Sequence, residues 1–551
     1  MNTILYNANI YTVNPAQPRA TALAISHGRI VAVGSDSDVG NIALPGLQRV
    51  DMQGAFVLPG LIDAHLHLEW SGYDLQQVRV YNKTRIDDAV AVVRARAQNT
   101  PAGKWIRGRG WNQADWGGPS TGAQDVLPTA AHLDIATTAH PVFLNSRSGH
   151  SGWANSAAMR LANVTKDTPN PQGGEIVRDT QGHPTGLFLE NAMGLIGKHV
   201  PTPTPQEAED ATLLAMREMN KKGLTGVHCM DGDGGIQTFG TYQRLREQQR
   251  STLRVVKMLP VQALDEVVGA GLRSGFGDAW LRIGGIKVFV DGALGPKSAA
   301  MVEAYEGEPT NHGIDIYDRE MLTEFAIKSF QHGLSVTTHA IGDRANHDIL
   351  DAYEVGLKET TAGRPPTNAT TSGGRSSVVG GLRNRIEHAQ VLQPTDIPRF
   401  AQMGVIASMQ PIHATSDMKM VDAYWGPRGR YAYAWRDLLN SGAVLALGSD
   451  APVESFDPLV GIHAAVTRQR ADGTPEGGWY PEQRLTMAEA IYGYTLGAAY
   501  AGYSEHELGS IEVGKLADLT VLSHDLTQIA PSEILNVQVE RVMVDGVWQG
   551  E

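Results

Sequence analysis

The sequence contains a single cysteine, Cys229, among 551 residues. One cysteine cannot form an intramolecular disulfide, and it excludes zinc sites built from several thiolates. An excess of basic residues is missing too, because 46 Lys and Arg stand against 59 Asp and Glu, which gives a net charge of −13. Without a basic footprint, we expect no nucleic-acid partner.

Long apolar runs are also missing from the sequence. No stretch is long and apolar enough to span a bilayer, so we expect no membrane partner. The first residues, Met1–Tyr6, lack the charged segment followed by an apolar segment that is typical of a signal peptide, and they predict a strand instead. We therefore expect a cytoplasmic protein.

The two ends of the chain have β character. Alternating or β-rich runs, with turns at Gly28 and at Asp545-Gly546, are Ile4–Val13, Ala22–Val33, Arg49–Leu58, Ala517–Leu522 and Arg541–Trp548. Two separate β modules of this size would each have a thin core. We therefore expect residues 1–58 and 506–551 to form one small β-sandwich domain.

The middle of the chain alternates short apolar runs with amphipathic helical stretches. The eight runs are Pro59–His67, Leu224–Met230, Arg254–Pro260, Gly285–Val290, Leu334–His339, Asn384–His388, Gly404–Gln410 and Ala443–Asp450. Apolar strands that are each followed by a helix predict a parallel sheet with both faces covered. Eight such units predict an α/β fold, a (β/α)8 TIM-type barrel over residues 59–505.

The spacing between the first two runs is unusually long. Roughly 150 residues separate them, and a structureless loop of that length is improbable in a compact domain. We therefore expect a large insertion at about residues 70–222, which forms a lid or a subdomain.

A pair of histidines, His65 and His67, stands at the end of the first run. Residues i and i+2 of a strand share a face, so two imidazoles at this spacing can hold one cation. The H-x-H pattern alone is a weak signal. Its position strengthens it, because barrel enzymes carry their catalytic groups at the carboxyl ends of the strands.

A lysine, Lys287, lies inside the fourth run. One interpretation is a side chain that extends from the strand end to solvent. The other is a lysine near metal that is neutral because of burial and neighbouring positive charge. A neutral amine can react with carbon dioxide to form a carbamate, an anionic ligand able to bridge two metals.

Three more residues of types that bind metals stand at the ends of later runs: His339, His388 and Asp450. Taken singly, each has a structural explanation, a histidine satisfied in the core or an aspartate that caps the next helix. Taken together they predict metal ligands, because neutral imidazole is a common ligand and a carboxylate at a buried strand end needs a cation or a partner. Asp450 would also accept a proton from bound water.

This joint pattern of H-x-H, Lys, His, His and Asp on strands one, four, five, six and eight resembles the metal ligands of the amidohydrolase superfamily. The resemblance covers nearly the whole chain, and residues 509–519 resemble that superfamily's C-terminal β-sandwich segment. Shorter motifs resemble its family 3 branch, which contains N-substituted formamide deformylases: Gly110-Trp111-Asn112, Gly149-His150, Lys287–Gly292, His339–Asp343, Glu387-His388 and Ser449–Val453.

The resemblance implies roles for these residues. His65, His67 and Asp450 would bind the more buried metal, and a carboxylated Lys287 would bridge to a second metal held by His339 and His388. An unmodified Lys287 would leave one metal and would give His339 or His388 a role in substrate binding or proton transfer. Zinc is the expected ion for such ligands, which iron, manganese and cobalt also fit.

Four further residues are predicted to contact substrate. His150 is assigned by its place in the resemblance, and His413 by its position just after the seventh run. His228 ends the second run, where a role in the core is equally compatible. Trp111, with Trp116, predicts either packing of the insertion or an aromatic wall of the substrate site.

We therefore expect a metal-dependent hydrolase that cleaves an amide-type, non-peptide C–N bond of a small molecule by attack of metal-activated hydroxide, with Asp450 moving the proton. Deamination, ester or lactone hydrolysis, and isomerisation at the same site are alternatives, because the barrel does not choose among them. A non-catalytic scaffold is the least favoured, because every ligand position is filled. A homodimer is the default expectation for such an enzyme.

Overall fold

The structure is a computed structural model that describes residues 2–81, 83–111, 116, 127–146, 151–232, 237–361 and 381–550. The chain divides into two compact units, Met1–Ser71 with Thr212–Glu551, and Gly72–Ala211. Within the described ranges, no helix is both long enough and apolar enough to cross a membrane.

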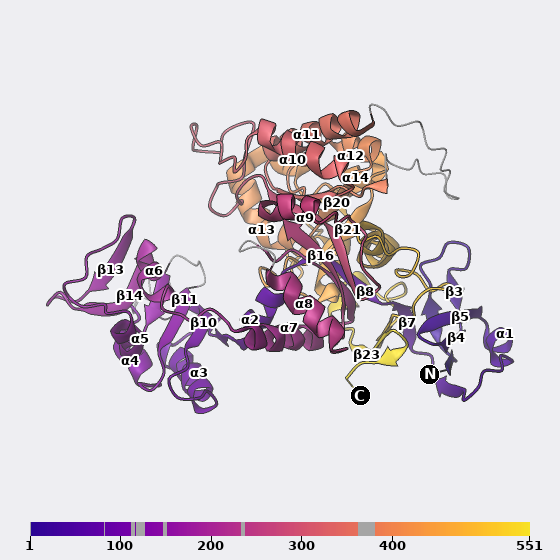
Figure 1. Cartoon of the computed structure of the whole chain (residues 1–551), viewed down its shortest axis with the longest axis horizontal. Coiled ribbons are helices and arrows are strands. Elements are labelled where there is room, and N and C mark those ends of the chain that lie inside the picture. Colours follow the sequence, from indigo (N-terminus) through magenta and orange to yellow (C-terminus); the bar gives the residue numbers. More distant parts are fainter. Residues whose placement is uncertain are drawn as a thin grey trace. The chain divides into compact units, whose positions relative to one another are not determined.

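The first unit contains eight parallel strands in the order β21-β20-β19-β18-β17-β16-β15-β8. Four of them, β8, β16, β20 and β21, are labelled in Figure 1. They are β8 (Leu61–Leu66), β15 (Leu224–Cys229), β16 (Arg254–Pro260), β17 (Leu281–Phe289), β18 (Val336–Ala340), β19 (Arg385–His388), β20 (Ile406–Met409) and β21 (Leu445–Leu447). Each strand overlaps one of the eight predicted runs. The predicted (β/α)8 barrel is therefore confirmed.

The barrel closes between β8 and the segment that follows β21. The amide of Asp450 donates to the His65 carbonyl at 2.7 Å, and the amide of His67 donates to the Ala451 carbonyl at 2.8 Å. A Cβ at Gly448 would lie 2.5 Å from the His65 nitrogen, so only glycine allows the two segments to approach this closely. The seam of the barrel thus joins residues that the sequence predicts as metal ligands.

Helices follow the strands along the chain. Their bounds are α1 (Asp36–Gly40), α2 (Leu68–Gln76), α7 (Pro205–Asn220), α8 (Gln237–Glu247), α9 (Leu264–Gly269), α10 (Arg319–Gln331), α11 (Asp343–Thr361), α12 (Ile397–Met403), α13 (Pro411–Trp425), α14 (Trp435–Ser441), α15 (Pro458–Thr467), α16 (Met487–Tyr492) and α17 (Ala498–Ala501). Pro411 occupies the first turn of α13, where a missing amide hydrogen costs nothing.

Two small sheets are built from the chain ends. One has the order β5 (Arg29–Gly34), β4 (Ala22–Ser26), β1 (Asn2–Tyr6) and β6 (Gln48–Asp51). The other has the order β24 (Val547–Trp548), β23 (Val539–Val544), β22 (Leu519–Leu522), β7 (Phe56–Pro59), β2 (Asn9–Tyr11) and β3 (Arg19–Ala20). The second sheet takes strands from both termini, and Leu5, Val57 and Leu519 share one buried cluster. The expected β structure formed by both ends is therefore present.

The predicted run Arg49–Leu58 is not one extended segment. It is split between β6 and β7, which belong to different sheets. Gln53 and Gly54 between them have positive φ values of 53° and 80°, so the chain turns there. Alternation of apolar residues alone did not reveal this turn.

The second unit forms its own six-stranded sheet. The order is β13 (Gly174–Arg178), β14 (Pro184–Glu190), β12 (Ser151–Ala154), β11 (Val142–Ser146), β10 (Ile106–Trp111) and β9 (Val78–Arg79), with helices α3 (Ile86–Gln98), α4 (Ala130–Asp134), α5 (Ser156–Leu161) and α6 (Gly194–Gly197). Its core includes Trp111, Val142, Leu144 and Trp153. The segment between the first two barrel strands therefore has a hydrophobic core of its own.

A buried ion pair connects the barrel to the terminal sheet. The guanidinium of Arg254 on β16 donates to both carboxylate oxygens of Asp518, at 2.6 and 2.8 Å. The two side chains are only 4% and 3% exposed. Removing one partner of such a pair leaves an uncompensated charge in the interior.

We expect Asp518→Ala to destabilise the protein by roughly 3 kcal/mol, because Arg254 loses its buried counter-charge and keeps only the partly exposed Asp545, at 3.3 Å. The measurement is the urea unfolding curve followed by circular dichroism. The matched control is Glu218→Gln, which removes the exposed Lys221–Glu218 pair and should change stability by less than about 1 kcal/mol. Equal curves for the two variants would contradict this account.

Candidate metal centre

A cavity of about 500 Å³ opens where the barrel strands end. Seven of the side chains predicted from sequence line it: His65, His67, Lys287, His339, His388, His413 and Asp450. They come from six different barrel strands or the segments that follow them. The fold therefore brings these widely separated residues to one place.

Three donors meet at one side of this cavity. Nε2 of His65 and Nε2 of His67 lie 3.3 and 3.4 Å from Oδ1 of Asp450. The ligand atoms of the three residues all lie within 4.8 Å of one another, and all three residues are buried. Two imidazoles and a carboxylate form a donor set that suits zinc and leaves a coordination position open.

The orientation of His65 and His67 is fixed by carboxylates on their far sides. Nδ1 of His65 lies 2.5 Å from Oε2 of Glu387, and Nδ1 of His67 lies 3.3 Å from Oδ1 of Asp231. An ionised carboxylate only accepts hydrogen bonds, so each Nδ1 must be the donor. Each Nε2 then presents its lone pair to the place where a cation would sit.

His339 and His388 are held in the same manner by neutral acceptors. Nε2 of His339 donates to the Gly292 carbonyl at 3.0 Å, which leaves Nδ1 with a lone pair. Nδ1 of His388 donates to Oε1 of Gln410 at 2.8 Å, which leaves Nε2. Their ring centroids are 4.6 Å apart.

The same two rings are kept neutral. Burial, followed by the positive charge of Lys287, lowers the pKa of His339 to about 3. Burial and the neighbouring His339 and His65 hold the pKa of His388 well below its ordinary value. Neutral imidazole is the form that binds metals, so this electrostatic environment fits the predicted role.

Glu387 is anchored by a buried arginine two residues earlier on β19. Nε of Arg385 lies 2.8 Å from Oε1 of Glu387, and both side chains are 0% exposed. Arg385 also donates to the Ala64 carbonyl at 2.6 Å and to the Ser408 hydroxyl at 2.7 Å. Burial alone would raise the pKa of Glu387, but Arg385 and His65 outweigh it and bring the pKa to about 2. The acceptor of the His65 proton is therefore charged at neutral pH.

Two site residues occupy an unusual backbone conformation. His388 has φ of 69° and Asp450 has φ of 61°, in the left-handed region that residues other than glycine rarely adopt. Each such position costs on the order of 1 kcal/mol and persists where the surroundings fix it. This backbone conformation sets the direction of both side chains where the strands end.

Lys287 borders the cavity beside the two neutral histidines. Its side chain is buried at 4% exposure, and Nζ lies 4.6 Å from the centroid of the Phe289 ring. Its charge contributes to lowering the pKa of both His339 and His388. The side chain therefore does not extend to solvent from the strand end.

His413, on α13, lies between two carboxylates, as His65 and His67 also do. Its Nε2 lies 3.3 Å from Oδ2 of Asp450, and its Nδ1 lies 4.0 Å from Oε1 of Glu454. Burial opposes a charged ring, but the two carboxylates outweigh it and raise the pKa of His413 to about 10. His413 thus faces the cavity with a carboxylate at each nitrogen.

His228 is not among the residues that line the cavity. Its Nδ1 accepts a hydrogen bond from Nη1 of Arg385 at 2.8 Å, so the ring lies on the far side of the arginine that holds Glu387. Burial and the charge of Arg385 keep its pKa well below the ordinary value. The structure therefore places His228 in the core, which is one of the two roles that its position in the sequence allowed.

Of the two insertion residues that are predicted to contact substrate, Trp111 and His150, the structure describes only Trp111. Trp111 is 1% exposed, and its indole N–H donates to the Leu144 carbonyl at 2.8 Å. Its ring stacks on Trp116, with centroids 5.9 Å apart. Trp111 therefore packs within the core of the second unit, and His150 lies outside the described residues.

Sequence reasoning missed the acceptors that orient the histidines: Asp231, Gly292, Glu387 and Gln410. Two of them had a visible signal. Glu387 and Arg385 lie in one short, fully buried strand, and Asp231 comes two residues after the second strand. A charge inside or just beyond a buried strand needs a partner, which the histidines supply.

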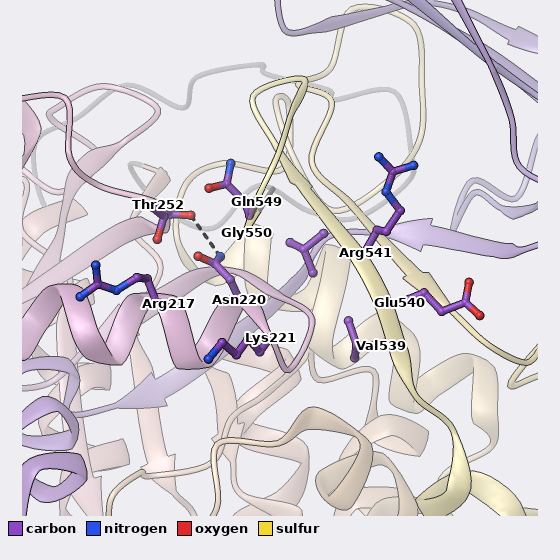
Figure 2. Close-up of a pocket in the computed structure, with 10 residues that line it drawn as sticks. Arg217, Asn220, Lys221, Thr252, Val539, Glu540, Arg541, Gln549 and Gly550 are labelled. Carbon is purple, nitrogen blue, oxygen red and sulfur yellow. Dashed lines mark hydrogen bonds between the residues drawn. The ribbon is translucent and has the colours of Figure 1, made fainter.

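A second hollow of about 400 Å³ lies between the end of α7 and the β23 strand (Figure 2). Asn220 there donates to the Thr252 carbonyl at 3.2 Å. The charged end of Arg541 points away from those of Arg217 and Lys221 in this view. This hollow therefore lacks the converging donors of the larger cavity.

Comparison with known sequences agrees with this geometry. The sequence profile of the amidohydrolase family matches residues 48–548. The chain belongs to the amidohydrolase family. This amidohydrolase is 32% identical over 552 residues to the putative amidohydrolase YtcJ of Bacillus subtilis, with 99% of each chain covered. It is 30% identical over 565 residues to the N-substituted formamide deformylase of Arthrobacter pascens, with 100% and 98% covered.

Solved structures give the same result for this amidohydrolase. A metal-dependent hydrolase from Pyrococcus furiosus has a TM-score of 0.76 and 28% identity, with 96% of this chain and 100% of that chain covered. The resemblance to the formamide deformylase branch is confirmed, and the chain is a metal-dependent hydrolytic enzyme.

We expect Glu387→Gln to weaken zinc binding by roughly 10–100-fold, because the variant loses the charged acceptor that orients His65. Competition with a chromophoric chelator measures the affinity. The matched control is Glu505→Gln, which removes the pair with Arg383, whose two side chains are 14% and 16% exposed. A folded Glu387→Gln protein with unchanged zinc affinity would show that the carboxylate has no role in orienting the ligand.

Proposed function

We propose that this amidohydrolase cleaves a non-peptide C–N bond of a small amide, with a zinc ion held by His65, His67 and Asp450. The observation that carries the proposal is the convergence of two Nε2 atoms and Oδ1 of Asp450 in a buried cavity. A bound divalent ion in such a site polarises a carbonyl and lowers the pKa of water toward about 7. The reaction adds water across the bond and yields an acid and an amine.

Asp450 is the residue proposed to move the proton. Its Oδ1 faces His65 and His67, and its Oδ2 faces His413. Oδ2 can therefore take a proton from the attacking water and deliver it to the nitrogen that leaves the carbonyl carbon. His413 lies where it would contact the substrate or the proton in transit.

Lys287 is proposed to carry a carbamate. Its amine would add to carbon dioxide with loss of a proton, which forms an N–C bond and a carboxylate. Together with His339 and His388, whose uncommitted nitrogens border the same cavity, that carboxylate would complete the site for a second ion.

The cavity and one relative support the proposed substrate class. Apolar side chains form much of the wall, namely Trp70, Phe289, Leu294, Ile341 and Met420. A relative matched over nearly the full length of both chains is an N-substituted formamide deformylase. We therefore propose that the substrates are small N-substituted amides with a hydrocarbon group. We also propose that the enzyme is a cytoplasmic homodimer.

We expect Asp450→Asn and His67→Ala each to reduce kcat/KM for an N-substituted formamide by roughly 10³-fold or more, because proton transfer or metal binding is lost. Release of the amine, followed by chromatography, measures turnover. His506→Asn is the matched control, because His506 has a side chain that is 90% exposed. Near-normal rates in folded Asp450→Asn and His67→Ala proteins would refute the assignment.

A panel of substrates, each followed by chromatography of the substrate and its product, separates amide cleavage from deamination and from ester or lactone hydrolysis. The panel contains N-substituted formamides, longer acyl amides, aminopurines, simple esters and lactones. The proposal expects turnover of the amides. Turnover confined to aminopurines or to esters and lactones would replace amide cleavage with deamination or ester hydrolysis at the same donors.

We expect Lys287→Arg to remove the carbamate, because a guanidinium remains protonated and does not add carbon dioxide. After incubation with ¹³C-bicarbonate, the ¹³C NMR spectrum of the wild type should contain a protein carbamate resonance that Lys287→Arg lacks. Identical spectra for the two proteins would show that Lys287 is unmodified.

A further inference from the structure

We propose that His388, His413 and Asp450 form an auxiliary zinc site that fills when zinc is in excess and then blocks turnover. One ligand atom from each of these residues lies within 4.8 Å of the other two. The binding part of the proposal stands on this geometry alone. The effect on turnover rests on the proposed function.

The two oxygens of Asp450 face different sets of histidines. Oδ1 is directed to Nε2 of His65 and His67, at 3.3 and 3.4 Å, whereas Oδ2 is directed to Nε2 of His413, at 3.3 Å. A carboxylate arranged in this manner can bridge two cations, one at each oxygen. The auxiliary ion therefore does not need to displace an ion bound by His65 and His67.

The two histidines of the auxiliary site can each offer one nitrogen. Nδ1 of His388 is committed to Gln410, which leaves Nε2. Nδ1 of His413 lies 4.0 Å from Oε1 of Glu454, a carboxylate that can accept its proton while Nε2 binds the ion. Their ring centroids are 5.9 Å apart, and both residues line the cavity through which an ion would enter. Two imidazoles and one carboxylate form a donor set that suits zinc.

Occupation of the auxiliary site interferes with the reaction in two respects. It engages Oδ2 of Asp450, the atom proposed to accept and return the proton. It also takes His388 away from the arrangement that includes a carboxylated Lys287. The auxiliary ion and the ion bridged by the carbamate are therefore mutually exclusive, since both require His388.

The test measures zinc uptake in a background in which the carbamate route is closed. Lys287→Arg and Lys287→Arg/His413→Asn proteins are dialysed against increasing zinc, and bound zinc is determined by elemental analysis. We expect Lys287→Arg to bind one more zinc per chain than the double variant. Lys287→Arg/His506→Asn, which loses only an exposed histidine, should match Lys287→Arg. Equal uptake by Lys287→Arg and the double variant would overturn the proposal.

Crystals of the wild type soaked in excess zinc supply a measurement that needs no variant. An anomalous difference peak bounded by His388, His413 and Asp450 is expected, and a map without it would overturn the proposal. The wild type should also lose amide turnover over the zinc concentrations that fill the auxiliary site. If no amide is hydrolysed at all, the proposed function fails, whereas the uptake and diffraction results still decide whether the site exists.

Discussion

Four buried imidazole rings can each present a lone pair to the cavity only because the other nitrogen of each ring donates a hydrogen bond to a fixed acceptor. His65 and His67 donate to carboxylates, His339 to a backbone carbonyl and His388 to a side-chain amide. A ring without such a partner would be free to rotate and to exchange tautomers, and would lose rotamer entropy on binding a cation. The acceptors supply this order in advance, so the donors already converge.

The barrel brings these side chains together because its strands all end at one rim. Strands from distant parts of the chain each contribute a residue there, and the seam between β8 and β21 passes through His65 and Asp450 themselves. The left-handed backbone at His388 and Asp450 lies at this rim, where buried strands hold it in place.

Much of this organisation could be predicted from the sequence, because it follows from local patterns. Apolar runs punctuated by polar residues identified all eight barrel strands, and H-x-H at a strand end predicted the first two candidate ligands, which the structure places in the cavity. The orienting acceptors could not be found in this way, because the partner of His65 is Glu387, 322 positions away. Proximity across a barrel depends on register and side-chain direction, which a single sequence does not state. For the same reason, His228 was indistinguishable from a residue of the cavity wall, and the turn inside Arg49–Leu58 was hidden by its β-rich composition.

The sheet shared by the chain ends has a consequence for biosynthesis. Strand β7, at residues 56–59, pairs with β22, at residues 519–522, so its neighbour is translated roughly 460 residues later. On the ribosome, β7 therefore emerges long before the strand that covers its edge, and it has to be kept from pairing with other chains during that interval. Completion of this sheet, with the contact between Arg254 and Asp518, therefore comes only after all eight barrel strands have been synthesised.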